Sequence, residues 1–87
     1  MAQTSPPDRA RIVEEIRDAV LRIVPTVSAA DVRGDRHLRQ LGADSVDRVE
    51  IILTVLDRLG TRVPLAAFSD LPDLDAMADL LAGRVVR

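Results

Sequence analysis

The sequence predicts an all-α fold with three sizeable helices, one short helix and a long first loop. Apolar residues recur at three- and four-residue steps, which is the period of amphipathic helices. Hydrophobic residues make up 47% of the 87 residues, enough for one packed core. That core must be aliphatic, because Phe68 is the only aromatic residue.

A first helix is expected over residues 8–24, after a flexible lead-in at residues 1–7. Ser5 or Asp8 can cap its start, and Pro25 ends it. Further apolar positions widen its apolar stripe, so we expect this helix to pack on more than one neighbour. The stripe itself consists of Ile12, Ile16, Ala19, Val20 and Ile23.

Residues 25–44 form a connection whose length is uncommon in small domains and usually functional. Residues 28–31 can form one helical turn, and Gly42 allows a sharp turn before the next helix. Four apolar residues are spaced so that they can anchor this loop to the core: Val27, Val32, Leu38 and Leu41.

The second helix is expected over residues 45–59. Asp44 suits the N-cap, Asp47 completes a shortened capping box, and Gly60 suits the C-terminus. The apolar arc of this helix is too wide for one buried face, so part of it must stay exposed. The residues assigned to the core are Ile51, Ile52, Val55 and Leu59. The residues expected to be partly exposed, beside acidic groups and suited to partner docking, are Val46, Val49, Leu53 and Leu56.

The last third of the chain predicts a short helix of one or two turns over residues 63–68. Asp73 can then cap a last helix that runs to about residue 82, and Gly83 is expected to end it. Its inward residues are Leu74, Met77, Leu80 and Leu81. This division gives the lead-in at 1–7, one domain at 8–83 and a C-terminal tail at 84–87.

Composition excludes several classes of function. The chain has no cysteine and His37 is its only histidine, so no metal site is expected. The net charge is −2 and the basic residues, all arginine, are scattered, so no nucleic-acid surface is predicted. No apolar run approaches the roughly 20 residues of a membrane span, and residues 1–7 lack a secretion signal. We therefore expect a soluble, cytoplasmic monomer.

The functional interpretation depends on Ser45. A serine nucleophile needs a base, an orienting group and an oxyanion hole, which His37 alone cannot supply, so no enzyme is predicted. Ser45 can simply occupy the first turn of the helix. The same position also suits a phosphate esterified to its hydroxyl, because a helix N-terminus offers free N–H groups and partial positive charge. His37 is expected to fix the loop, or to contact a group attached to Ser45.

The stretch from Leu41 to Glu50, LGADSVDRVE, resembles the signature of acyl carrier proteins. The resemblance covers residues 8–83, including Val63-Pro64 and the spacing of the last helix. It implies a four-helix bundle with a short third helix and no catalysis by the chain itself. It also implies a 4′-phosphopantetheine arm on Ser45, which holds acyl groups as thioesters and which a phosphopantetheinyl transferase attaches from coenzyme A.

The resemblance further implies a partner-recognition surface around that serine. Val63 corresponds to the apolar residue beside the arm, and Leu41 and Gly42 to its loop approach. The residues implied in partner recognition are Asp44, Val46, Asp47, Arg48, Val49, Glu50, Leu53, Leu56 and Val63.

Departures from the fatty-acid carriers indicate a more specialised protein. Arg48 and Arg58 dilute the acidic second helix of those carriers, and Leu56 is apolar where they often have an acid. Partners are therefore expected to rely more on apolar contact, which favours a polyketide carrier. The residues from Ser45 to Ile51, followed by Val-Pro-Leu, are similar to freestanding carriers of HMG-synthase-like β-branching cassettes. Those carriers hold an acetyl unit for condensation with a β-keto polyketide.

The pathway partners would then be ketosynthase, acyltransferase or HMG-synthase-like enzymes. Two alternatives stay open. The chain could carry intermediates of fatty-acid-type or other polyketide chain extension, or it could be a plain helical interaction module in which Ser45 is an unmodified capping residue.

Overall fold

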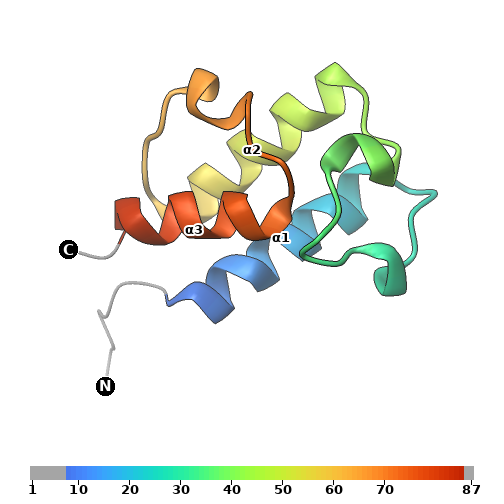
Figure 1. The fold of residues 1–87 in the computed structure, drawn as a ribbon, viewed down its shortest axis with the longest axis horizontal. Helices are drawn as coiled ribbons and strands as arrows, with labels where there is room; N and C mark the ends of the chain where they lie inside the picture. The colour runs from blue at the N-terminus through green and yellow to red at the C-terminus, as the bar shows by residue number, and fades with distance from the viewer. Residues whose placement is uncertain (1–7, 86–87) are drawn as a thin grey trace.

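The computed structural model describes residues 8–85, which form three α-helices and three short 3-10 helices (Figure 1). The α-helices are α1 (Arg9–Ile23), α2 (Ser45–Leu59) and α3 (Leu74–Val85). The short helices are η1 (Ala29–Asp31), η2 (Leu38–Leu41) and η3 (Leu65–Phe68). No strand occurs in this range, which confirms the all-α prediction. The predicted lead-in at 1–7 and the last two residues of the predicted tail lie outside the described residues.

The predicted short third helix is the 3-10 helix η3 and not an α-helix, so the expected count of four α-helices is not confirmed. Pro64 precedes η3 in an extended conformation, and the Ser69 hydroxyl donates to the Ala66 carbonyl at 2.8 Å where it ends. Four residues are too few to develop an α-helical ladder, and 3-10 geometry is common in pieces of this length.

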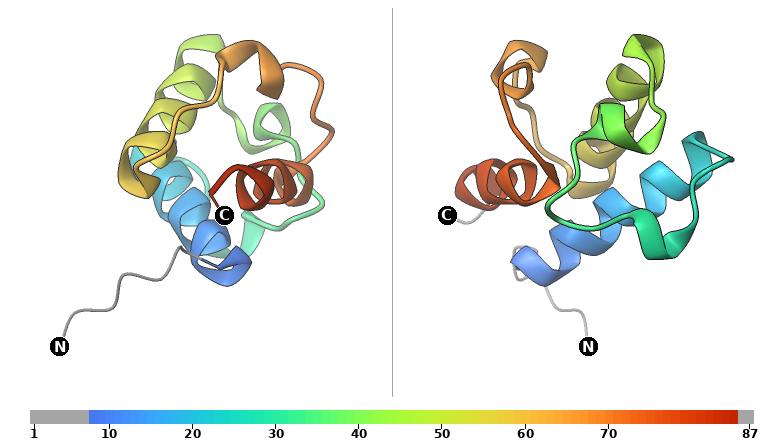
Figure 2. Two further views of the ribbon diagram at one scale, coloured as in Figure 1. Left: turned by 90° about the vertical axis from the view of Figure 1, so that its left-hand side faces the viewer. Right: turned by 45° about the vertical axis from the view of Figure 1, so that its right-hand side comes forward.

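Helix α1 packs against both α2 and α3, whereas α2 and α3 contact each other much less (Figure 2). Asp8 caps α1, because its carboxylate accepts the Arg11 N–H at 2.9 Å. Asp8 was one of the two predicted capping residues. Ile12, Ile16, Ala19 and Val20 of the predicted stripe are buried, and Ile23 is half-buried. The predicted double packing of this helix is therefore confirmed.

The long loop between α1 and α2 is anchored to the core and to α3. Val32, Leu38 and Leu41 are buried and Val27 is half-buried, which confirms their predicted role. The loop carbonyls of Gly34 and Arg36 accept the first N–H groups of α3, at 2.9 and 3.0 Å. These bonds fix the loop against α3. They also give acceptors to backbone N–H groups at the start of α3 that have no partner within the helix.

Helix α3 begins as predicted but ends later than predicted. The Asp73 carboxylate accepts the Ala76 N–H at 2.8 Å and so caps the helix. The prediction that Gly83 ends α3 is wrong, because the helix continues through it to Val85. Gly83 does not have the positive φ of a terminating glycine. A helical glycine costs only about 1 kcal/mol relative to alanine, so it does not by itself stop a helix.

Most of the predicted core of α2 is confirmed, with one correction and one partial result. Ile51, Ile52 and Val55 are buried, while Leu59 is only half-buried. Leu56 was expected to be partly exposed, and that prediction is wrong because the side chain is 7% exposed. After Gly60 the chain turns back, the Thr61 N–H donates to the Leu56 carbonyl at 3.1 Å, and the following residues cover Leu56.

Candidate functional site: an exposed serine at the start of α2

The approach to α2 is fixed by a turn at Gly42. This glycine ends η2 with φ +92°, a left-handed conformation that residues with a side chain rarely adopt. Ala43 then packs into the core at 4% exposed, and Asp44 follows as the N-cap. One buried residue therefore lies between the turn and the cap, which fixes where the first turn of α2 points.

The first turn of α2 is closed by the predicted capping box. The Asp44 carboxylate accepts the Asp47 N–H at 2.8 Å, and the Asp44 N–H donates to the Asp47 carboxylate at 3.3 Å. The N–H groups of Ser45 and Val46 have no acceptor among residues 8–85. The helix thus presents two free backbone donors beside the Ser45 side chain, and these suit an anion.

Ser45 is exposed, and its hydroxyl makes no hydrogen bond to any residue that the structure describes. The two other serines within residues 8–85 are already engaged. Ser28 donates to the Asp31 carboxylate at 2.9 Å, and Ser69 donates to the Ala66 carbonyl at 2.8 Å. Of these three hydroxyls, only that of Ser45 is available for modification without loss of an internal bond.

An apolar surface adjoins Ser45 along α2. Val46 is 71% exposed, Val49 41% and Leu53 51%, as the sequence predicted, and with Glu50 they line a shallow groove that begins at Ser45. We call Val46, Val49 and Leu53 the apolar strip. Large apolar side chains left this exposed on one face are characteristic of a surface that contacts another protein.

A pocket of about 290 Å³ opens on the other side of Ser45, between α2, η3 and α3. Its floor is apolar and includes Ile52, Phe68, Leu74 and Met77, whereas its rim carries polar groups. Phe68 and Met77 are core residues, as predicted. The pocket exists because α1 packs on both other helices while α2 and α3 diverge, and its size lies at the small end for ligand pockets.

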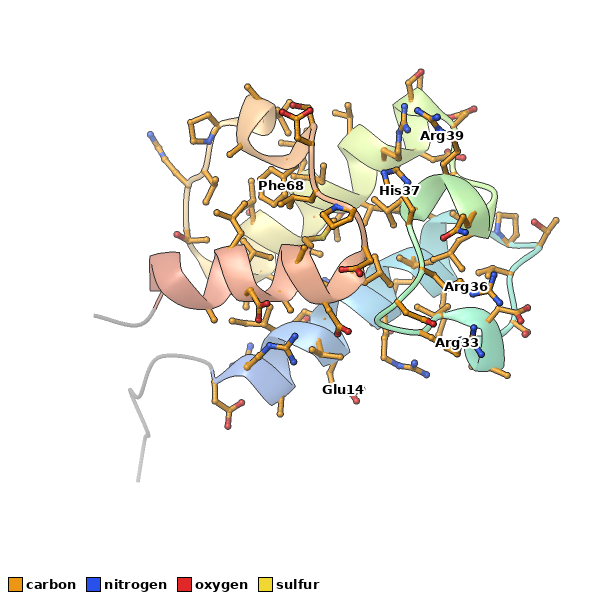
Figure 3. The ribbon with its side chains drawn as sticks, in the orientation of Figure 1. Glu14, Arg33, Arg36, His37, Arg39 and Phe68 are labelled. Atoms are coloured by element: carbon orange, nitrogen blue, oxygen red, sulfur yellow. The ribbon has the colours of Figure 1, made fainter. Side chains whose placement is uncertain are left out.

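One imidazole and two guanidinium groups line that pocket together with Ser45. They belong to His37, Arg39 and Arg48. Figure 3 shows His37 just before η2 and Arg39 on it, on the side of the molecule where α2 begins. His37 Nδ1 accepts the Arg39 N–H at 2.9 Å, and the His37 N–H donates to the Gln40 side chain at 2.8 Å. His37 therefore fixes the loop by capping η2, which was one of its two expected roles.

His37 does not form a catalytic pair with Ser45. No hydrogen bond joins the two side chains within residues 8–85, and His37 Nδ1 is occupied by the η2 cap. A nucleophilic serine needs a base within hydrogen-bond reach and a third group to orient that base. The geometry instead presents an exposed hydroxyl with no base to activate it.

Two of the predicted recognition residues are not brought to Ser45. Leu56 and Val63, the latter 6% exposed, line a separate groove near the end of α2 together with Leu53. That groove shares only Leu53 with the apolar strip. Leu56 and Val63 are thus buried and do not form part of the strip's surface. Leu53 lies further along the groove that begins at Ser45. The remaining predicted residues lie nearest Ser45: Asp44, Val46, Asp47, Arg48, Val49 and Glu50.

Sequence reasoning missed two residues of the site. Leu65 of η3 is 42% exposed and lines the pocket beside Ser45 together with Val49. Arg39 also lines that pocket, from η2. Leu65 follows Pro64 in a segment too short to show a helical period, so its face was not predictable. Arg39 lies in a loop whose path only the folded structure defines.

No helix among residues 8–85 is long and apolar enough to cross a membrane. Within the same residues, no three side chains from histidine, cysteine, aspartate and glutamate cluster closely enough to hold a metal ion.

Comparison with known proteins agrees with this geometry. Residues 14–81 match the family described as "Phosphopantetheine attachment site", so the chain belongs to that family. It is 32% identical over 78 residues to the polyketide biosynthesis acyl-carrier-protein AcpK of Bacillus subtilis (strain 168). The match covers 90% of this chain and 95% of that protein. No solved structure matches.

Family membership decides between the open classes of function. The chain is a non-catalytic acyl carrier with a phosphopantetheine attachment site, and not a plain interaction module. Such carriers work with a phosphopantetheinyl transferase and with the enzymes of their pathway. The exposed hydroxyl at a helix start, with free backbone donors beside it, fits a phosphate ester. When bound, the arm supplies the thiol that holds acyl groups as thioesters. This chain supplies the residue to which the arm is attached and the protein surface next to that residue.

Proposed function

We propose that Ser45 is the residue that carries the 4′-phosphopantetheine and that the chain is a cytoplasmic, monomeric carrier of polyketide biosynthesis. The observation that carries the assignment is the free Ser45 hydroxyl at the start of α2. The family match spans three serines, and the other two, Ser28 and Ser69, are engaged in internal hydrogen bonds. The similarity to AcpK over nearly the whole length of both proteins supports the polyketide pathway.

Intact-mass analysis tests the attachment site. The apo protein is incubated with coenzyme A and a promiscuous phosphopantetheinyl transferase, and the mass gain of one phosphopantetheinyl group is expected. Ser45→Ala should abolish the gain, while the matched control Ser69→Ala should retain it. A gain that survives Ser45→Ala would refute the assignment.

The apolar strip is proposed as the docking surface for the pathway enzymes, with Leu65 extending it across the pocket mouth. Its exposure is the argument, since Val46, Val49, Leu53 and Leu65 are the large apolar residues that stay exposed among residues 8–85. Asp44, Asp47 and Glu50 add an acidic rim, and Arg48 interrupts it. Partners would therefore be selected by apolar fit, with charge setting the orientation.

A charge placed in the strip tests this surface. Leu53→Asp or Val49→Asp should raise the KM of a partner enzyme for the loaded carrier by roughly five- to thirtyfold, because a central apolar contact is worth about 1–2 kcal/mol. Helicity should be largely retained. Ala10→Asp adds the same charge to an exposed position of α1 and serves as the control. A collapse of the circular dichroism signal in the strip variants would show that these side chains support the fold.

For the acyl group, we propose that the carrier donates an acetyl unit in an HMG-synthase-like β-branching reaction. The support is the similarity of the Ser45–Ile51 stretch, followed by Val-Pro-Leu, to carriers of such cassettes. The alternative is a carrier of fatty-acid-type or other polyketide chain extension. Loading the arm with acetyl or with malonyl and offering the cognate HMG-synthase-like enzyme separates the two. If the acetyl-loaded protein supports no condensation, the β-branching assignment fails.

A further inference from the structure

The acidic cap of α2 creates an electrostatic problem for a phosphate at Ser45. The Asp44 and Asp47 carboxylates close the capping box on either side of this serine. A phosphodiester on the Ser45 hydroxyl adds a further negative charge to the helical turn that holds both carboxylates, and neighbouring like charges repel. The free N–H groups and the dipole of α2 offset part of this repulsion, but the helix carries both carboxylates in its own cap.

Two guanidinium groups are placed to offset the remaining repulsion between the phosphodiester and the two carboxylates. Arg39 comes from η2 and Arg48 from α2, and both line the pocket whose rim includes Ser45. Arg48 is three residues after Ser45, so the two side chains share one face of the helix. The two cations thus line one pocket with the serine and come from separate elements of the fold.

Neither guanidinium has a counter-ion within the part of the chain that the structure describes. The guanidinium groups of Arg39 and Arg48 form no ion pair and no hydrogen bond there; the bond from Arg39 to His37 Nδ1 comes from the backbone N–H of Arg39. Other arginines are engaged, such as Arg9 with Asp79 at 2.8 Å and Arg58 with Glu15 at 3.2 Å. The side chains of Arg36 and Arg62 also form no ion pair within residues 8–85, but neither lines this pocket. The carboxylate that lines the same pocket, Asp73, accepts the Ala76 N–H to cap α3.

We propose that Arg39 and Arg48 are positioning residues that hold the phosphodiester of the arm against the start of α2. Arginine suits this task because its planar donors match phosphate oxygens. Contact from two elements would give the base of the arm a preferred direction, toward the pocket and η3. This inference rests on the proposed attachment at Ser45 and adds two residues to it.

The test compares apo and holo protein for the wild type, Arg39→Gln, Arg48→Gln and the control Arg62→Gln. Arg62 is exposed and lies beyond the end of α2, so its replacement removes the same charge far from Ser45. Intact mass first establishes that each holo sample carries one arm. The holo-minus-apo difference in Tm is then measured at low salt and at about 1 M salt, where the Debye length is about 3 Å. Phosphorus NMR of each holo sample reports on the phosphodiester directly.

At low salt, the holo-minus-apo difference in Tm should be smaller in Arg39→Gln and Arg48→Gln than in the wild type, by roughly 1–5 °C for exposed ion pairs in a domain of this size. The difference between variants should vanish at high salt, and the phosphorus resonance should move in these two variants but not in Arg62→Gln. Equal Tm differences with an unmoved resonance in all four proteins would overturn the proposal. Failure of the wild type to gain the arm would instead refute the attachment at Ser45.

Discussion

The two ends of α2 are similarly apolar in sequence but differ in what covers them. At the start of the helix, Val46 is 71% exposed and Val49 41%. Near its end, Val55 is 1% and Leu56 7% exposed. The difference lies in the chain that flanks each end. After Gly60 the backbone turns back, and the residues at 61–64 line a groove together with Leu56. Before Ser45 the chain approaches through η2 (Figure 1).

This contrast explains how one helix serves both the core and a surface. The end that α1 and the returning chain enclose stabilises the fold, and Leu56, a predicted recognition residue, is buried there. The other end carries an exposed serine, free backbone donors and the apolar strip. The scaffold can therefore bear exposed apolar surface at one end because Val55 and Leu56 are buried at the other.

Truncating Leu53 and Leu56 separately to alanine should show the difference between the exposed and buried parts of α2 most clearly. Leu56→Ala removes a buried side chain and should lower the free energy of unfolding by about 2–4 kcal/mol. Leu53→Ala lies on the exposed strip and should cost less than about 1 kcal/mol. Urea unfolding of the two variants measures both values. Equal losses would mean that the strip is as well packed as the core.

The glycines that flank α2 give a second, smaller pair of effects. Gly42 has φ +92° and Gly60 φ +66°, and an added Cβ would meet nothing closer than Val24 Cγ1 at 3.8 Å. Backbone strain alone should therefore set the cost. Alanine tolerates φ near +60° better than +92°, so we expect a loss of about 1 kcal/mol for Gly60→Ala and about 2 kcal/mol for Gly42→Ala.

The matched control for these glycines is Gly83→Ala, which lies within α3 in open space. Alanine favours a helix interior over glycine, so this change should stabilise the protein by up to about 1 kcal/mol. Thermal and urea unfolding of the three variants give the comparison. A loss at Gly83, or no loss at Gly42, would contradict the assigned backbone conformations.

The sequence predicted those parts of the fold that local chemistry determines. The bounds of α2, the capping box and the turn at Gly42 follow from side chains within a few residues of one another. The burial of Leu56 was not predictable, because it depends on where the chain goes after Gly60. Leu65 and Arg39 were missed for the same reason, since each reaches the Ser45 pocket from another element. Helical periodicity indicates which residues are apolar, but tertiary contacts decide which of them are covered.

The smallest expected effect on stability comes from removing a charge. It compares Arg58, near the end of α2, with Arg48, near its start. Arg58 contacts Glu15 at 3.2 Å and also Asp18, which joins α2 to α1. The hydrogen bond from Arg58 is the main cause of a lowered pKa for Asp18; the charge of Arg22 adds to it, and burial opposes it. Arg48 has no such partner within residues 8–85.

Arg58→Gln should therefore lower the free energy of unfolding at neutral pH, while Arg48→Gln should leave that of the apo protein unchanged. Because the pKa of Asp18 is lowered on folding, the stability that its charge contributes is present above the pKa of the unfolded chain. That contribution is lost as the pH falls through the pKa of the folded state. The wild type should thus lose its advantage over Arg58→Gln in acid, as urea unfolding over a pH series would measure. An advantage that persists after Asp18 is protonated would show that Arg58 acts by packing its stem between the helices, since a guanidinium without its counter-ion keeps only that contact.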